Sequence, residues 1–108
     1  MDLKDKVAFI TGSTRGIGLE IAKAFAKEGS NIVLNGRSAI SDALIAEITD
    51  LGVKCIAVSG DISDFDQASR MIKETEDQLG PVTILVNNAG ITNDKLMLRM
   101  KPDEFDQV

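Results

Sequence analysis

Three glycines with hydroxyl and cationic neighbours follow the first apolar run of the chain. The segment Thr11-Gly12-Ser13-Thr14-Arg15-Gly16-Ile17-Gly18 comes directly after Val7-Ala8-Phe9-Ile10. A strand that leads through a glycine-rich turn into a helix presents backbone N–H groups at the positive end of the helix dipole, where phosphate binds. The spacing is neither the G-x-G-x-x-G dinucleotide fingerprint nor a phosphate loop, because no Gly-Lys-Ser/Thr follows. It predicts a nucleotide site, with a purely structural turn as the alternative.

Each glycine of this turn has a predicted task. Gly12 permits the tight turn, Gly16 lets the backbone approach a phosphate, and Gly18 lets the helix pack closely on the strand. The intervening side chains add donors and charge to the same place: the hydroxyls of Ser13 and Thr14 and the guanidinium of Arg15.

Polar residues also follow the second and third apolar runs. An acid about 20 residues after the glycines commonly holds the adenosine ribose hydroxyls, but the chain has Asn35-Gly36-Arg37 there. Arg37, together with Arg15, can instead hold a 2′-phosphate, and the alternative is a pair of solvated surface arginines. In Gly60-Asp61-Ile62, Asp61 can accept a hydrogen bond from an adenine amino group or can simply begin a turn into a helix.

A pair of asparagines follows the fourth apolar run, in Asn87-Asn88-Ala89-Gly90. Adjacent amides at a strand end can bond neighbouring backbone and a ribose together. The alternative is a turn that uses Asn and Gly for positive φ.

Short apolar runs alternate with segments of helical spacing along the whole chain. The expected strands are 7–10, 32–34, 55–58 and 82–86, and the expected helices are marked by apolar residues at 17–25, 40–51 and 65–79. Ser63 or Asp64 is a plausible N-cap of the third helix, and Pro102-Asp103-Glu104 has the composition of a first turn of a fourth helix. Strands that are apolar throughout are typical of a parallel sheet buried on both faces.

These elements predict an α/β fold with a doubly wound, Rossmann-like parallel sheet in the order 3-2-1-4. The ligand crevice is then expected beyond the carboxyl ends of strands 1 and 4, where the winding reverses. Residues 1–108 form the N-terminal part of a single nucleotide-binding domain in this interpretation, since a dinucleotide fold has two mononucleotide halves.

Composition narrows the function classes. The net charge of −5, with acids and bases interleaved, argues against nucleic acid and an anionic membrane surface. No run approaches the roughly 20 apolar residues of a membrane span, and the charged N-terminus is unlike a signal peptide. The single cysteine, Cys55, lies in an apolar run, which predicts a buried thiol and a reducing cytoplasm. No metal site is expected.

Taken together and in this order, the motifs resemble those of the short-chain dehydrogenase/reductase family. The matching residues are Thr11-Gly12-x-x-x-Gly16-x-Gly18, Asp61-Ile62 and Asn87-Asn88-Ala89-Gly90. The stretch from Gly90 to Met100 is similar to that of bacterial 3-oxoacyl-[acyl-carrier-protein] reductases. The resemblance covers all 108 residues, which correspond to somewhat less than the first half of a family member.

The resemblance implies NADPH as cofactor and reduction of a 3-oxoacyl group on acyl carrier protein, in fatty-acid biosynthesis in the cytoplasm. Alternatives are another small carbonyl or alcohol, such as a sugar or steroid, or a nucleotide-binding module without catalysis. It implies a pyrophosphate at Gly12–Arg15 and Ile17, a 2′-phosphate at Arg15 and Arg37, adenine at Asp61 and Ile62, and ribose at Asn88, Ala89 and Gly90.

One departure concerns catalysis. The catalytic Asn, Ser and Tyr-x-x-x-Lys of the family lie beyond position 108, and the chain contains no Tyr and no His. No catalytic residue therefore carries over, and we expect the 108 residues alone to be inactive. The family resemblance implies a homotetramer for a full-length member. We expect the chain itself to associate through strand 82–86, whose outer edge has no predicted partner.

Overall fold

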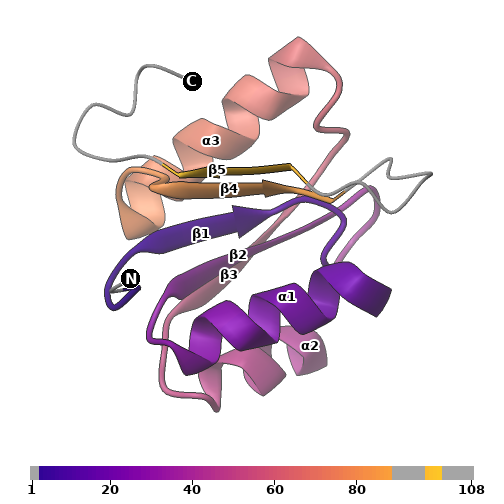
Figure 1. The fold of residues 1–108 in the computed structure, drawn as a ribbon. Coiled ribbons are helices and arrows are strands. Elements are labelled where there is room, and N and C mark those ends of the chain that lie inside the picture. The colour runs from indigo at the N-terminus through magenta and orange to yellow at the C-terminus, as the bar shows by residue number, and fades with distance from the viewer. Residues whose placement is uncertain (1–2, 89–96, 101–108) are drawn as a thin grey trace.

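The computed structural model describes residues 3–88 and the backbone of residues 97–100. It contains a sheet flanked by helices on both faces (Figure 1). The strands are β1 (Val7–Ile10), β2 (Asn31–Gly36), β3 (Cys55–Ser59), β4 (Ile84–Asn87) and β5 (Met97–Met100). The helices are α1 (Gly16–Lys27), α2 (Asp42–Thr49) and α3 (Phe65–Leu79).

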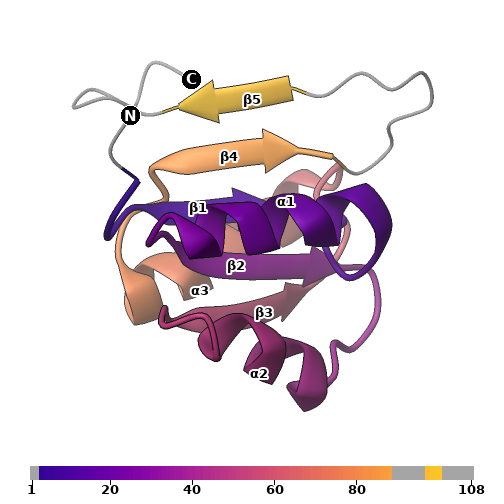
Figure 2. The same cartoon turned by 60° about the horizontal axis from the view of Figure 1, so that its bottom comes forward.

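The sheet has the strand order β3-β2-β1-β4-β5, and its first four strands are parallel. Phe9 at the centre of β1 lies opposite Val33 of β2 on one side and Leu85 of β4 on the other. Figure 2 shows these four strands with their carboxyl ends at the same edge. The predicted order 3-2-1-4 and the doubly wound architecture are therefore confirmed.

The outer edge of β4 is not unpaired, and our expectation of an open edge there was wrong. β5 pairs with β4 in the antiparallel sense, with Leu85 opposite Arg99 and Asn87 opposite Met97. An antiparallel neighbour needs only a short connection in sequence, whereas a parallel one needs a crossover of a dozen or more residues. Residues 97–100 can thus cover this edge without a further helix, and the physical reason given for association through strand 82–86 no longer holds.

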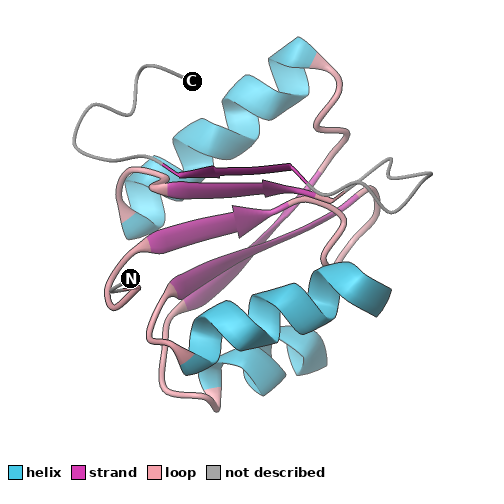
Figure 3. Ribbon diagram, viewed as in Figure 1, coloured by secondary structure: helices cyan, strands magenta, loops and turns pink. Residues whose placement is uncertain are grey.

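Each face of the sheet packs against its own helices (Figure 3). One apolar cluster lies between the sheet and α1 and α2, and it includes Ala8, Ile10 and Ile48. The other lies beneath α3 and includes Phe9 and Met71. Neighbouring residues of β1 thus point to opposite clusters, which explains why all four residues of this strand are buried and apolar.

Helix α1 turns a face of small residues to the sheet. Its buried positions are Gly18, Ala22 and Ala26, whereas Ile17, the first of the apolar residues that marked this helix in the sequence, is 63% exposed. Small residues at a spacing of four let a helix axis lie close to the strands, and the larger Ile21 then packs at the side of the contact. This close approach brings the N-terminus of α1 to the carboxyl end of β1.

The ends of the other two helices follow local rules. Ser41 caps α2 by accepting a hydrogen bond from the N–H of Leu44, and Asp64 caps α3 through the N–H of Gln67. The second of the two predicted caps, Asp64, is therefore the one used. The predicted helix start at 102–104 lies outside the described residues. None of the described helices is long and apolar enough to cross a membrane.

Candidate functional site

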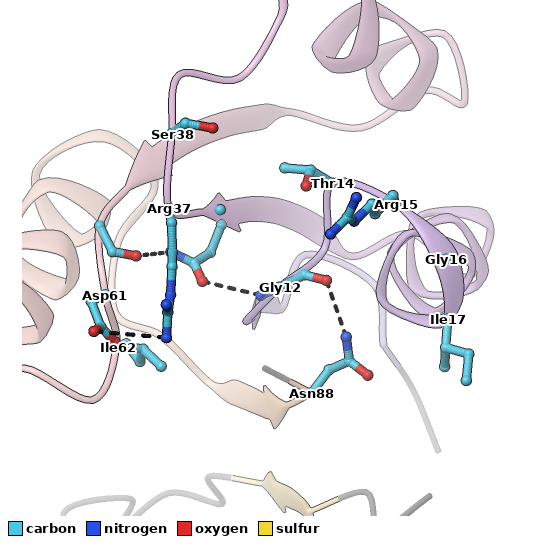
Figure 4. A pocket seen from close by; sticks show the side chains of 13 residues that line it. Gly12, Thr14, Arg15, Gly16, Ile17, Arg37, Ser38, Asp61, Ile62 and Asn88 are labelled. Atoms are coloured by element: carbon cyan, nitrogen blue, oxygen red, sulfur yellow. Dashed lines mark hydrogen bonds and ion pairs between the residues drawn. The ribbon is translucent and has the colours of Figure 1, made fainter. Parts of the chain in front are cut away.

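A cavity of about 820 Å³ lies at the carboxyl edge of the parallel strands. Four connecting segments supply its walls: those after β1, β2, β3 and β4 (Figure 4). The lining residues are Gly12, Thr14, Arg15, Gly16, Ile17, Asn35, Gly36, Arg37, Ser38, Gly60, Asp61, Ile62 and Asn88. The cavity lies where the order of the strands reverses, which is the crevice expected from the sequence.

The glycine-rich turn forms one wall and needs its glycines for backbone reasons. Gly12 has φ +59° and Gly16 has φ +60°, a region that residues with a Cβ rarely adopt. A Cβ on Gly16 meets nothing within 4 Å, so the space beside this residue is open to a ligand. The turn therefore leads the chain into α1 and leaves room beside its first residue.

The N-terminus of α1 differs from those of the other two helices. Arg15, its N-cap residue, makes no side-chain cap hydrogen bond, and the first turn contains no acidic residue. Helices α2 and α3 each have a side-chain cap and an acid in the first turn. The positive end of the α1 dipole is thus not neutralised by these devices and faces a cavity beside two arginines, which favours an anion.

Contacts between β1 and β4 hold the floor of the site. The N–H of Asn88 donates to the Thr11 hydroxyl at 2.8 Å, and the Asn88 side-chain amide donates to the Gly12 carbonyl oxygen at 3.0 Å. A Cβ on Gly18 would clash with that carbonyl oxygen and would lie 2.5 Å from Asn88 Nδ2. Gly18 therefore acts through close packing, as predicted, and it does not line the cavity.

Ser13 also lies apart from the cavity. It is fully buried, and its N–H donates to the Asn35 carbonyl oxygen at 2.8 Å. Its hydroxyl oxygen accepts a hydrogen bond from the Asn35 N–H, also at 2.8 Å. This pairing joins the turn to β2, so the Ser13 hydroxyl faces the protein interior, whereas Thr14 faces the cavity.

Arg37 and Asp61 face one another across the opposite wall. Arg37 Nη2 lies 3.9 Å from Asp61 Oδ2, and the Arg37 side chain is 84% exposed. Hydrogen bonds from the Ser63 hydroxyl and N–H lower the pKa of Asp61, and the nearby Arg37 charge lowers it further. Asp61 is consequently ionised at neutral pH. The two side chains form a solvated ion pair, which a competing charged ligand can open at little cost.

Helix α3 holds the loop that carries Asp61. The Gln67 side-chain oxygen accepts from the N–H of Asp61 at 2.8 Å, and Arg70 donates to the Ser59 carbonyl oxygen at 3.1 Å. Gly60 has φ +157°, and a Cβ there would lie about 3 Å from side chains of α3. The loop is therefore fixed by its contacts with α3 before any ligand binds.

The structure brings together most of the predicted site residues. Those that line the cavity are Gly12, Thr14, Arg15, Gly16, Ile17, Arg37, Asp61, Ile62 and Asn88. Ser13 and Gly18 support it from behind, and Ala89 and Gly90 lie outside the described residues. The lining also includes four residues without a predicted role in ligand binding: Asn35, Gly36, Ser38 and Gly60. Their position at or after strand ends is the signal in the sequence that could have identified Asn35 and Gly60.

This arrangement suits binding rather than proton transfer. The charged side chains in the described lining are Arg15, Arg37 and Asp61, and this lining includes no His, Tyr, Cys or Lys. Within the described residues there is no group of three metal-ligating side chains. The cavity offers two cations, a helix N-terminus and amide groups, which together fit a ligand with several phosphates and polar ring edges.

Comparison with known proteins finds this chain similar to dehydrogenases and reductases. A family model described as short chain dehydrogenase matches residues 6–108. A 3-oxoacyl-[acyl-carrier-protein] reductase from Staphylococcus aureus is 44% identical over 105 residues, which are 95% of this chain and 43% of that protein. The chain thus spans less than half the length of this relative.

Two solved structures have the same fold. One is a 3-oxoacyl-[acyl-carrier protein] reductase from Brucella melitensis in complex with NAD, with a TM-score of 0.75 and 33% identity. The match covers 83% of this chain and 35% of that one. The other is a blue fluorescent protein from a metagenomic library in complex with NADPH, with a TM-score of 0.76 and 39% identity, covering 84% of this chain and 38% of that one.

Proposed function

The chain belongs to the short-chain dehydrogenase family, and from this premise we propose that its cavity binds NADP(H) for a 3-oxoacyl-[acyl-carrier-protein] reductase activity. The similarity to reductases of that name supports the substrate class. The observation that carries the cofactor assignment is the pair of arginines at the cavity, Arg15 and Arg37, in place of an acid after β2. The two parts of the proposal are tested separately.

The fit of a dinucleotide pyrophosphate rests on the N-terminus of α1. Its N-cap residue provides no side-chain acceptor, its first turn has no acid, and the space beside Gly16 is open. A bound pyrophosphate supplies the negative charge that this helix end lacks. The Thr14 hydroxyl and the Arg15 guanidinium line the same wall and can donate to phosphate oxygens.

The preference for a 2′-phosphate follows from a comparison of two interactions. The solvated pair of Arg37 with Asp61 contributes about 0–1 kcal/mol. A hydrogen bond from a guanidinium to a phosphate contributes about 1.5–3 kcal/mol and is often bidentate. A 2′-phosphate can therefore displace Asp61 from Arg37, and the freed carboxylate remains available to the adenine amino group. A 2′-hydroxyl offers Arg37 no comparable partner.

The remaining polar groups suit the adenine and ribose. Asp61 and Ile62 lie side by side in the lining. Asp61 can make a polar contact with one edge of an adenine, and Ile62 can make an apolar contact with one of its faces. The Asn88 side chain points toward Gly12, to whose carbonyl oxygen its amide donates (Figure 4). Its side-chain oxygen can accept from a ribose hydroxyl while its amide stays bonded to Gly12.

The reaction proposed is hydride transfer from NADPH to the 3-keto carbon of an acyl chain held on acyl carrier protein. When bound, the cofactor supplies the hydride. The residues of this chain bind and orient the adenine half of it, and the proton donor comes from elsewhere, since the 108 residues contain no Tyr or His. Such an enzyme acts on cytoplasmic substrates and assembles as a homotetramer in this proposal.

NAD(H) is the second candidate cofactor. It is favoured by one observation, the NAD bound to the structurally similar reductase from Brucella melitensis. The distinction rests on Arg15 and above all on Arg37, the partner of Asp61, because the other groups of the cavity would contact both cofactors equally.

Titration of the purified chain with NADPH and with NADH, followed by nicotinamide fluorescence, tests the cofactor. We expect NADPH to bind roughly 10- to 100-fold more tightly, which corresponds to about 1.5–3 kcal/mol. Equal dissociation constants, or tighter NADH, contradict the assignment. Assay of the longer protein with acetoacetyl thioesters tests the substrate, and we expect the 108-residue chain alone to bind NADPH without turnover.

A further inference from the structure

The side chain of Asn35 lies beneath the cavity, between its two walls. Asn35 is the second-last residue of β2 and is 2% exposed. Its Oδ1 accepts a hydrogen bond from the N–H of Gly12 at 3.1 Å. Its Nδ2 donates to the carbonyl oxygens of Val58 and Gly60, each at 3.3 Å. One buried side chain therefore bonds the turn after β1 and the loop after β3 simultaneously.

The hydrogen-bonding pattern at this position matches an amide and no other side chain of similar size. One partner is a donor, the Gly12 N–H, and two are acceptors, the Val58 and Gly60 carbonyl oxygens. Aspartate would turn a carboxylate oxygen toward those carbonyls, and leucine would remove all three of these side-chain hydrogen bonds. Met71 Sδ, 3.4 Å from Nδ2, closes the remaining side.

The two segments joined by Asn35 form opposite parts of the cavity. Gly12 begins the wall that we assign to the pyrophosphate, and Gly60 precedes Asp61 on the wall that we assign to adenine. Both glycines have positive φ, +59° and +157°, and because glycine adopts many backbone conformations, contacts such as those of Asn35 select one conformation of each turn. The main chain of Asn35 also bonds Ser13 in both directions, which fixes the turn further.

We propose that Asn35 is a positioning residue for the cofactor: it couples the phosphate wall to the adenine wall, so that a ligand on one wall affects the other. This inference rests on the proposed function, since it takes a dinucleotide as the ligand that spans both walls. Asn35 lies at the cavity floor and acts through Gly12 and Gly60. Its loss weakens the affinity for the whole dinucleotide, because both walls lose their common support.

Two variants with a control test this role in the purified protein. Asn35→Leu should raise the dissociation constant for NADP⁺ roughly 10- to 100-fold, since it removes three buried hydrogen bonds that join the two walls. In Asn35→Asp, burial and the facing carbonyl oxygens raise the pKa of the new carboxyl group above its usual value of about 3.9. Its neutral form can donate to one carbonyl and accept from Gly12, so its affinity relative to wild type should recover roughly tenfold between pH 8 and pH 5.5.

The control is Thr75→Val, which removes a buried hydroxyl bonded to Met71 on α3, away from the cavity. We expect Thr75→Val to lower the melting temperature and to leave the NADP⁺ affinity within about twofold of wild type. Asn35 variants that bind NADP⁺ as tightly as this control, or an Asn35→Asp affinity ratio that does not change with pH, overturn the inference. Wild-type protein that binds no NADP⁺ overturns the proposed function as well.

A measurement on the unmodified protein remains decisive if the variants do not fold. In this proposal inorganic pyrophosphate binds at the phosphate wall, so its direct effects on amide resonances should centre on residues 12–17. We expect it also to shift the Asn35 side-chain amide and the Gly60 backbone amide, with the same saturation curve. Saturation of the Gly12 resonance while Asn35 and Gly60 remain unchanged shows that the walls are not coupled.

Discussion

Replacement of Arg37 is the perturbation with the most specific expected result. Its side chain is 84% exposed, and its partner Asp61 lies 3.9 Å away. Removal of the pair itself costs about 0–1 kcal/mol, so the fold should be unaffected. Removal of a guanidinium–phosphate bond costs about 1.5–3 kcal/mol, and the exposure of Arg37 places the effect at the lower end of that range. Arg37→Ala should therefore raise the NADPH dissociation constant roughly tenfold.

The NADH dissociation constant should change by less than about twofold, because a 2′-hydroxyl gives Arg37 no charged partner. Arg37→Asp should go further and reverse the preference, since two carboxylates at one place repel a phosphate. Lys73→Ala is the matched control: Lys73 is an exposed cation 3.9 Å from Asp77 on α3, outside the cavity. Both dissociation constants should be measured by fluorescence at low and high salt.

The salt dependence of binding tests whether the preference for NADPH is electrostatic. At about 1 M salt the Debye length falls to about 3 Å, so the advantage of NADPH over NADH in the wild-type protein should shrink. An unchanged NADPH/NADH ratio in Arg37→Asp refutes the assignment of Arg37 to the 2′-phosphate. A fall of the same size in Lys73→Ala would mean that only the net charge matters.

Two further predictions concern packing. Gly18→Ala adds a Cβ that clashes with the Gly12 carbonyl oxygen and lies 2.5 Å from Asn88 Nδ2, so we expect a loss of about 1–3 kcal/mol in stability together with weaker NADPH binding. Gly52→Ala, with open space but positive φ, should lower stability alone, and a loss of NADPH affinity there as large as in Gly18→Ala contradicts this account. Burial raises the pKa of the Cys55 thiol to about 12 from 9.0, so the native protein should react slowly with a thiol reagent at pH 8 and rapidly once unfolded. The free energy of unfolding should also fall as pH rises from 9 toward 12, because the Cys55 thiol loses its proton at lower pH in the unfolded chain than in the folded one. A Cys55→Ala variant whose stability falls with pH in the same way over this range refutes this prediction.

The element order and the position of the cavity could be predicted from the sequence because their signals are local. Apolar runs such as 7–10 mark strands buried on both faces, and a glycine-rich turn before a helical period marks a strand–helix junction. The pair Ser63-Asp64 before α3 predicted an N-cap at one of these two residues, and Asp64 is the one used. Parallel strands bring their carboxyl ends to one edge of the sheet. The strand order alone therefore predicts that residues 12, 37, 61 and 88 lie around one cavity.

Three features depended on contacts between distant residues and were not predictable in the same way. The apolar spacing that marked α1 included the exposed Ile17, whereas close packing on the sheet selects small residues such as Ala22. The hydroxyl of Ser13 pairs with the backbone of Asn35 rather than with a ligand. The antiparallel pairing of β5 with β4 depends on contacts between the two strands, and the sequence at 97–100 has no alternation of apolar and polar residues that would predict a strand.

The most direct test of the account is to locate the dinucleotide on the protein. Amide resonances of the isotopically labelled chain should be followed during titration with NADPH. We expect the resonances of Gly12, Arg15, Arg37, Asp61 and Asn88 to shift with one dissociation constant, while Ile72, in a separate groove along α3, stays unchanged. Shifts centred on Ile72, or no shift at these five residues at millimolar NADPH, would contradict the claim that this cavity is the cofactor site.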